Sequence, residues 1–168
     1  WISGIYLSLI RGTPLMVQAF FIYFGITGAL HIRITPFSAA ILVLCLNAGA
    51  YLSEIFRSGI AAVNKGQMEA ARSLGLSYGK AMRKVILPQA FRTMLPTIIN
   101  QFIISLKDTS LISVIGPREL TQNSKIIAAN ASSMVMPIYL SVAIFYLVIC
   151  TILSRVAKYV ERRVSYGK

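Results

Sequence analysis

Long apolar segments alternate with short polar segments along most of this chain. A helix that crosses a bilayer needs about 20 mostly apolar residues, with roughly 17 to 25 tolerated. Four windows meet that requirement, and the only charged side chains in them are Glu54, Arg57, Lys107 and Asp108; the windows are Pro14–Leu30, Ala39–Ala62, Pro96–Gly116 and Pro137–Leu153. The pattern predicts an all-α integral membrane protein with about four visible spans.

Composition supports this class and argues against another. Of the 168 residues, 56% are hydrophobic and 13% are charged, about half the charged share of a soluble domain. A net charge of +12 raises the hypothesis of nucleic-acid binding, so the placement of the cations decides the class. Eleven of the seventeen Lys and Arg residues lie in two blocks separated by apolar segments: Lys65, Arg72, Lys80, Arg83, Lys84 and Arg92, then Arg155, Lys158, Arg162, Arg163 and Lys168. This distribution is typical of a membrane protein, and no nucleic-acid partner is expected.

The two basic blocks also predict an orientation. Short loops rich in Lys and Arg stay in the cytoplasm, and two spans separate the blocks, so both lie on the same side of the membrane. Residues 64–92 and the C-terminus are therefore expected in the cytoplasm, with the loops at 31–36 and 117–134 outside. Within the second outer loop, residues 120–129 (LTQNSKIIAA) are expected to form a short helix on the outer surface.

Other features give little chemistry. His31 is the single histidine and has no Cys or carboxylate near it in sequence, so a metal site is not expected. Cys45 and Cys150 lie inside apolar runs, where a thiol behaves as a small hydrophobic side chain, so no disulfide is expected. The chain begins at Trp1 without a signal-peptide pattern, and we expect it to be part of a longer protein.

The cytoplasmic loop at residues 64–92 begins with a helical pattern. In MEAARSL (68–74), Ala70, Ala71 and Leu74 fall on one side of a helix. Gly75 is expected to end that helix, because the residue just past a helix end often needs a positive φ.

A second helix is expected after that glycine. Ser77 is a candidate N-cap. Met82, Val85, Ile86 and Gln89 follow the i, i+3, i+4, i+7 spacing of one helix face. Pro88 is expected to end regular helix and to bend the chain back toward the membrane. The sequence thus predicts two short helices at an angle.

Three interpretations of this loop remain open at this point. It is a basic interfacial loop that only sets the topology, a helix-turn-helix that binds DNA, or a docking surface for a cytoplasmic partner protein. Tethering between two spans argues against DNA binding. A nucleotide site is excluded, because LGLSYGKA has Leu74 where a phosphate loop needs glycine and Ala81 where it needs Ser or Thr.

The motifs themselves carry a resemblance. Glu69-Ala70-Ala71, Gly75 six residues after Glu69, and Leu87-Pro88 match the EAA loop of ABC importer permeases, with Val85 where that motif usually has isoleucine. The segments RGTPLMVQAFFIYFG, NAGAYLSEIFRSGI and NQFIISLKDTSLISVIG resemble the polar amino-acid permease subfamily, with glutamine-type permeases the most similar. The resemblance covers almost the whole chain.

This resemblance implies a type I ABC importer permease bundle, with residues 1–168 as a single permease domain. Such permeases usually have five spans, so the first span is expected to be missing here. The implied partners are two ATPase subunits, a second permease subunit in an expected homodimer, and a substrate-binding protein or fused domain outside. The chain is then no enzyme and holds no cofactor, because ATP and Mg²⁺ belong to the ATPase. The implied location is a bacterial inner membrane, and the implied substrate is a polar amino acid.

The resemblance also implies a role for the motif residues. They would lie in a groove of the ATPase and transmit its closure to the spans; they are Glu69, Ala70, Ala71, Gly75, Val85, Leu87 and Pro88. Two interpretations of Glu69 stay open: it pairs with a basic residue of the ATPase, or it interacts with the dipole at the N-terminal end of its helix.

Two charges near the middle of a predicted span are candidates for the substrate site. Counted from Pro96, Lys107 lies about 16 Å into a core of about 30 Å. A charge at that depth is costly, so it should face a cavity or a partner. An amino-acid zwitterion needs a cation and an anion, which Lys107 and Asp108 supply. The alternative is that both form structural ion pairs with other helices. Thr109 and Ser110 join the candidates, although such hydroxyls more often bond to their own helix.

Further polar residues on the spans complete the predicted pathway. Asn47 and Tyr51 are expected to line a cavity, Glu54 and Arg57 to line or gate its inner mouth, and Gln101 to lie on the polar side of its helix. Glu54 and Arg57 also have the i, i+3 spacing of a simple pair. A secondary transporter or channel for small zwitterions would use mid-membrane charges equally well. The EAA-type loop favours the ATP-driven permease, because only a permease coupled to an ATPase needs it.

Overall fold

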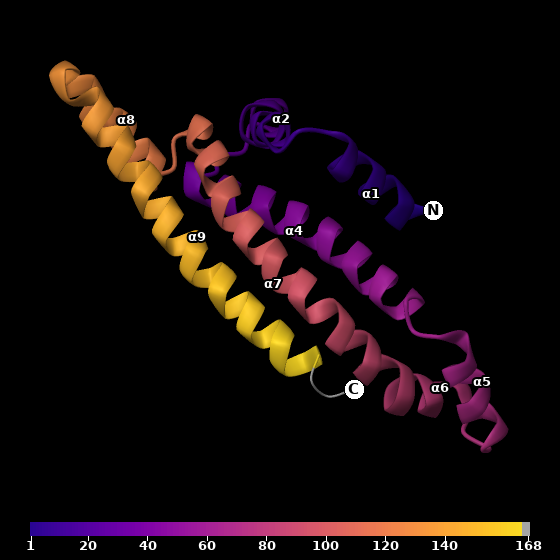
Figure 1. The fold of residues 1–168 in the computed structure, drawn as a ribbon. Coiled ribbons are helices and arrows are strands. Elements are labelled where there is room, and N and C mark those ends of the chain that lie inside the picture. The colour runs from indigo at the N-terminus through magenta and orange to yellow at the C-terminus, as the bar shows by residue number, and fades with distance from the viewer. Residues whose placement is uncertain (166–168) are drawn as a thin grey trace. The chain divides into compact units, whose positions relative to one another are not determined.

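The structure is a computed structural model that describes residues 1–165, and Lys168 of the second basic block lies outside the described residues. Figure 1 shows that this part of the chain is helical throughout, without strands. The α-helices are α1 (Ile2–Gly12), α2 (Leu15–Phe20), α3 (Thr27–Leu30), α4 (Pro36–Ala61), α5 (Lys65–Ser73), α6 (Tyr78–Ala81), α7 (Leu87–Ile112), α8 (Leu120–Asn130) and α9 (Val135–Ser165). Two π-helical segments (Phe21–Ile26 and Met82–Ile86) and two 3₁₀ turns (Ser113–Ile115 and Ser132–Met134) join some of them.

The described chain forms two compact units, each made of two segments. The first unit contains residues 1–50 and 102–154, and the second contains residues 51–101 and the described residues from 155 onward. The core of the first unit is apolar and is formed by α2, the π-helical segment after it, the start of α4, the last residue of α7 and the 3₁₀ turn that follows; its buried members are Leu15, Ala19, Ile22, Ala39, Ala40, Val43, Ile112 and Ile115. Small alanines in this core allow the helices to approach closely, as is common in membrane bundles.

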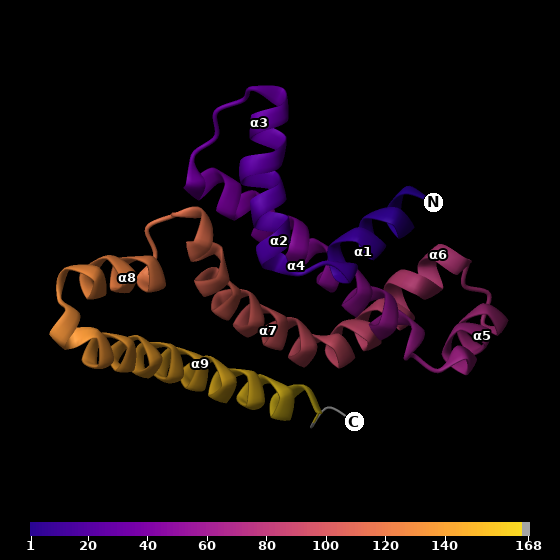
Figure 2. The same cartoon turned by 90° about the horizontal axis from the view of Figure 1, so that it is seen from above.

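A sharp bend separates α1 from the helical segment Leu15–Leu30. The two helices meet at 110°, and Figure 2 shows the chain turning between them. Pro14 is the N-cap of α2 and has an extended backbone (φ −64°, ψ 141°), with φ restrained by its ring. Gln18 is buried and donates from Nε2 to the carbonyl oxygens of Ile10 (2.7 Å) and Thr13 (3.0 Å). Its side chain therefore satisfies the carbonyls that the end of α1 leaves unpaired.

Close packing of two helices defines part of the second unit. Gly59 on α4 lies so near α7 that a Cβ there would be 3.0 Å from Cβ of Met94 and 3.2 Å from its sulfur. Met94 is itself buried. Glycine at position 59 thus lets these two helices approach more closely than any larger residue would.

The predicted spans are largely confirmed as helices. α4 contains nearly all of the window Ala39–Ala62, and α9 contains the window Pro137–Leu153. Within residues 1–165, three helices are long and apolar enough to cross a membrane, and a fourth span results if α1 and Leu15–Leu30 together form one broken span. The window Pro14–Leu30 is therefore only one half of a bent pair.

The expectation that Pro88 ends a helix is wrong. Helical structure continues without a break from Tyr78 to Ile115, over 38 residues. The π-helical segment just before the proline gives the physical reason: the N–H of Leu87 bonds to the carbonyl oxygen of Met82, five residues back. This wider turn relieves the clash that a proline ring makes with the preceding turn of an α-helix. The loop therefore contains one short helix, α5, and the first turns of a long one.

Candidate functional site

The loop at residues 64–92 has well-defined ends around α5. The Asn64 side chain caps the helix by accepting a hydrogen bond from the N–H of Gly66 at 2.8 Å. At the other end Gly75 has φ 81°, as expected from the sequence. The N–H of Gly75 bonds to the carbonyl of Arg72 (3.0 Å), and the N–H of Leu76 bonds to the carbonyl of Ala71 (3.2 Å). These two bonds form a Schellman motif, which needs a left-handed residue at the glycine position.

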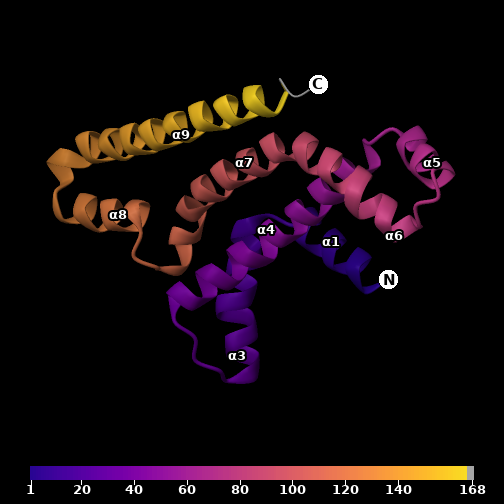
Figure 3. The same ribbon diagram turned by 90° about the horizontal axis from the view of Figure 1, so that it is seen from below.

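After this turn the chain reverses and packs on α5. Figures 2 and 3 show α5 and α6 side by side, and α5 contacts both α6 and the π-helical segment that follows. Ala71 on α5 is buried, as are Ala81 and Ile86 across from it. Nε2 of Gln89 also donates to Oε1 of Gln67 at 3.4 Å, which joins the start of α7 to α5. Ser77 precedes α6 but makes no capping hydrogen bond through its side chain.

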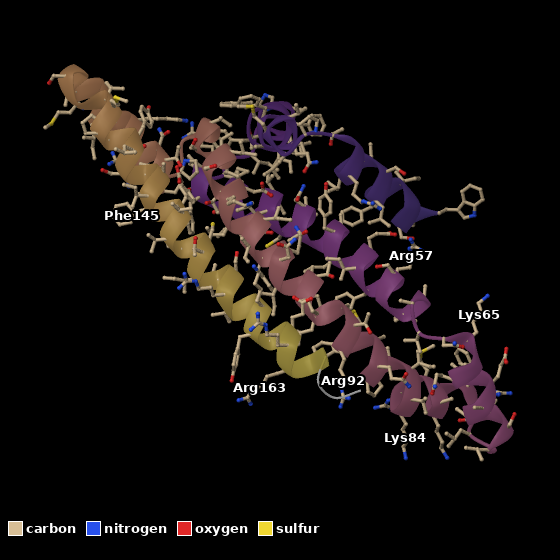
Figure 4. The ribbon with its side chains drawn as sticks, in the orientation of Figure 1. Arg57, Lys65, Lys84, Arg92, Phe145 and Arg163 are labelled. Carbon is tan, nitrogen blue, oxygen red and sulfur yellow. The ribbon has the colours of Figure 1, made fainter. Side chains whose placement is uncertain are left out.

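Some of the motif residues are buried within this loop and the others are exposed on its surface. Ala71 is buried and Val85 half-buried, so both hold α5 against the following helix. Glu69, Ala70, Gly75, Leu87 and Pro88 are exposed. Figure 4 shows that Lys65 and Lys84 also project outward from this part of the chain. The exposed set is thus available to a partner protein, while Ala71 and Val85 determine the shape that the partner would meet.

The position of Glu69 in α5 bears on its two interpretations, pairing with an ATPase cation or interacting with the helix dipole. This residue lies fifth in the nine-residue α5, and no acidic residue is in the first turn. Dipole stabilisation falls off within the first turn, so it contributes little here. Within the described residues, Glu69 forms no ion pair. Its exposed carboxylate is therefore better suited to a cation on a partner.

Two exposed apolar side chains at this turn were missed from the sequence. Leu74 is 84% exposed and Tyr78 is 59% exposed, on either side of Gly75. Helical periodicity placed Leu74 on one face with Ala70 and Ala71, but α5 ends at Ser73, so Leu74 leaves that face. The available signal was a large apolar residue directly before a helix-ending glycine in an otherwise cationic loop. The two exposed apolar side chains make this turn a candidate contact surface for a partner protein.

The polar residues predicted on α4 have separate environments. Glu54 and Arg57 form an ion pair, with Nε of Arg57 2.9 Å from Oε1 of Glu54. The pair confirms the simple i, i+3 interpretation, and the Arg57 side chain is 70% exposed. Asn47 is buried in the first unit, whereas Tyr51 begins the second unit and is partly exposed. A role for these four residues in a pathway stays a prediction.

Candidates on α7 differ in exposure. Gln101 is buried in the second unit. In the first unit Lys107 is exposed and Asp108 is half-buried. The Thr109 hydroxyl donates to the carbonyl of Leu106 (2.6 Å), and the Ser110 hydroxyl donates to the carbonyl of Lys107 (2.7 Å). These bonds occupy both hydroxyl protons, which leaves only acceptor capacity for a ligand.

Neither mid-span charge has an ion-pair partner among the described residues. In the part of the chain that the structure describes, no carboxylate lies within ion-pair distance of Lys107 and no cation lies within that distance of Asp108. Adjacent helical residues point about 100° apart, so the two side chains face different directions. A structural ion pair for either one would have to come from outside the described residues.

The uninterrupted helix changes the estimate of depth. Because helical structure begins at Tyr78, Pro96 is inside the helix and does not mark where it enters the membrane. Arg92 is the last cation before Lys107, about 22 Å away along the helix axis. The helical run ends at Ile115, about 12 Å beyond Lys107. Lys107 therefore lies nearer to Ile115, where this helical run ends, than to Arg92.

These features are those of a multi-pass membrane protein with charged residues within its long apolar helices. Residues 1–166 match the family model of the binding-protein-dependent transport system inner membrane component. The chain is 46% identical to the glutamine transport system permease protein GlnP of Escherichia coli (strain K12), over 98% of this chain and 77% of that protein. It is 43% identical to the L-cystine transport system permease protein TcyB of Bacillus subtilis (strain 168), over 98% of this chain and 70% of that protein.

A solved structure agrees with these relatives. The crystal structure of an amino acid ABC transporter with histidines superposes with a TM-score of 0.90 at 41% identity, and the match covers 95% of this chain and 74% of that one. The chain belongs to the family of binding-protein-dependent transport system inner membrane components. It is therefore a permease subunit of an ABC importer and not an enzyme, and membership implies an ATPase partner and a substrate-binding partner in general. The alternative of a secondary transporter or channel has no support among these relatives.

Proposed function

We propose that this permease imports a polar amino acid and that residues 64–92 dock on the ATPase that drives it. The named relatives support the substrate class, because they carry glutamine, cystine and arginine in their names. The single observation that supports docking is the rigid turn at Gly75, which exposes Leu74, Tyr78 and Glu69 together. The Schellman motif fixes the backbone of this turn before any partner binds, which lowers the ordering cost of association.

The remaining partners follow from the same proposal. A second copy of this permease completes the pathway, and a substrate-binding protein or fused domain delivers the amino acid from outside. ATP and Mg²⁺ are bound by the ATPase subunits. Within the pathway, Lys107 holds the substrate carboxylate and Asp108 its ammonium group. Asn47, Tyr51, Gln101 and the hydroxyls of Thr109 and Ser110 offer neutral contacts, and the pair Glu54–Arg57 lies toward the inner mouth.

Affinity purification of the full-length protein from its own membranes tests the proposal. We expect mass spectrometry to identify an ATPase in a stoichiometric complex and an amino acid in the extract of the purified assembly. ATP hydrolysis by the complex should rise when that amino acid and its binding protein are added to liposomes. Purification without an ATPase, or hydrolysis that no amino acid stimulates, contradicts the proposal.

The orientation is tested with single cysteines in a background that lacks Cys45 and Cys150. Asn123 is exposed on α8, whereas its neighbour Ser124 is buried, so Asn123→Cys is the better outside probe. Ser77→Cys is the matching inside probe, because Ser77 is exposed in the loop. An impermeant thiol reagent added to intact cells should label the Asn123→Cys variant and not the Ser77→Cys variant. Both should be labelled in inside-out vesicles opened with detergent. The opposite pattern in intact cells would reverse the topology.

A further inference from the structure

Three cations gather around a tyrosine near the C-terminal end of α9. Arg155, Lys158 and Arg162 are spaced i, i+3, i+7, so they lie on one side of the helix. Together with Tyr159 they line a shallow pocket of about 220 Å³. Arg163, labelled in Figure 4 at this end of α9, is next in sequence but lies over the Tyr159 ring, with 5.2 Å between its Cζ and the ring centroid.

Nothing within the described chain neutralises this pocket. All four lining side chains are exposed. Among the residues that the structure describes, no carboxylate pairs with Arg155, Lys158 or Arg162, although Glu161 is adjacent in sequence. Three like charges within about 10 Å along one helix repel each other. An anion bound in the pocket would therefore lower the electrostatic free energy of the three cations.

Position along the helix identifies the kind of anion. Residues 137–154 contain no charged side chain, and 18 helical residues extend about 27 Å, close to the thickness of a hydrocarbon core. Arg155 is therefore the first residue at the edge of that core, and Arg162 lies about 10 Å farther along the axis. This interval is the headgroup layer, where tyrosine rings also concentrate.

We propose that Arg155, Lys158 and Arg162 bind the phosphate of an anionic glycerophospholipid, with Tyr159 as one wall of the pocket. A guanidinium fork can bind two phosphate oxygens, and the ammonium group of Lys158 adds a further point charge. Clusters of cations directly after a membrane span attract anionic lipids by this mechanism. The glycerol backbone of such a lipid would lie at the level of Arg155, with its acyl chains in the bilayer. This site is independent of the substrate and of the ATPase.

Native mass spectrometry of the purified importer tests the proposal. The detergent-solubilised complex is titrated with didecanoyl phosphatidylglycerol and, separately, with didecanoyl phosphatidylcholine, which has the same chains and no net charge. We expect the protein to favour phosphatidylglycerol at least tenfold. Arg162→Gln should lower that preference about fivefold. The triple variant Arg155→Gln/Lys158→Gln/Arg162→Gln should lose it.

Arg163→Gln is the matched control, because it removes the same charge at the same depth but about 100° around the helix. It should change the preference less than twofold. If Arg162→Gln and Arg163→Gln lower the preference for phosphatidylglycerol equally, the attraction is general electrostatics and the proposal is wrong. If inorganic phosphate displaces the lipid at equal concentration, the site binds a phosphate ion and the lipid proposal is wrong. Parental lipid binding in the triple variant, with loss of the ATPase instead, overturns it in favour of a protein contact.

Discussion

Replacing Gly75 by valine is expected to disconnect the permease from its ATPase while leaving the spans folded. Gly75 has φ 81°, which a β-branched residue adopts only at a cost of about 1–3 kcal/mol. The Schellman bonds from the N–H groups of Gly75 and Leu76 should break to relieve that strain, so Leu74 and Tyr78 would no longer be held in place. We expect copurification of the ATPase to fall at least tenfold and stimulated ATP hydrolysis to fall with it.

Two further variants separate backbone conformation from side-chain volume. At both Gly75 and Gly79 an added Cβ would meet nothing within 4 Å, so space does not distinguish the two positions. Gly79 lies in α6, where valine is tolerated, so Gly79→Val should retain the ATPase. Gly75→Asn should recover most of the binding, because asparagine adopts left-handed conformations more readily than valine. Normal ATPase binding and transport by Gly75→Val would show that the turn is not the docking surface.

Neutralising either mid-span charge is expected to abolish most substrate-dependent transport. Hydrogen bonds to charged groups contribute about 1.5–3 kcal/mol, so Lys107→Met or Asp108→Asn should weaken apparent substrate affinity roughly 10- to 100-fold. Asp108→Asn keeps the side-chain volume and one acceptor, so it tests charge. Assembly and basal ATP hydrolysis should change little, because the docking loop is more than about 20 Å along the helix from Lys107. Uptake into liposomes and assembly in detergent measure the two effects separately.

Ser110→Ala provides the control for this experiment. The Ser110 hydroxyl already donates to the carbonyl of Lys107, so its removal should alter uptake only a few-fold. The double variant Lys107→Met/Asp108→Asn distinguishes a substrate site from structural pairing across subunits. If the charges are structural, each single variant strands a buried charge and costs about 3–5 kcal/mol of stability, and the double variant recovers expression. Normal uptake in either single variant, or uptake restored in the double, would exclude the substrate role.

Much of the fold was predictable because hydrophobic length and turn chemistry are local properties. The windows that became α4 and α9 are apolar over a full bilayer thickness, and Gly75 has the left-handed conformation that its position after α5 required. The helix at residues 120–129 was also found, as α8. Each of these features depends on a short stretch of sequence and little else.

The prediction failed where a second structural feature offset the effect of the residue that the prediction relied on. Pro88 usually ends a helix, but the π-helical segment before it absorbs the proline ring, and no residue type marks such a segment reliably. The 110° bend at Thr13–Pro14 depends on Gln18, which reaches back over eight residues to Ile10. The candidate pathway was less predictable still, because the depth of Lys107 depends on where its helix begins, and the subunit that Lys107 and Asp108 face is not a local property.

The close approach at Gly59 has an evolutionary consequence. A methyl group there would be 3.0 Å from Cβ of Met94, so even alanine requires its neighbour to move. Two routes of divergence remain: position 59 stays glycine in descendants, or it enlarges only in lineages where position 94 has already become glycine and so has lost its Cβ. The order of the two changes matters. If position 59 enlarged first, the intermediate protein would be overpacked between α4 and α7. These two sites, 35 residues apart in the chain, should therefore inherit their changes as a pair.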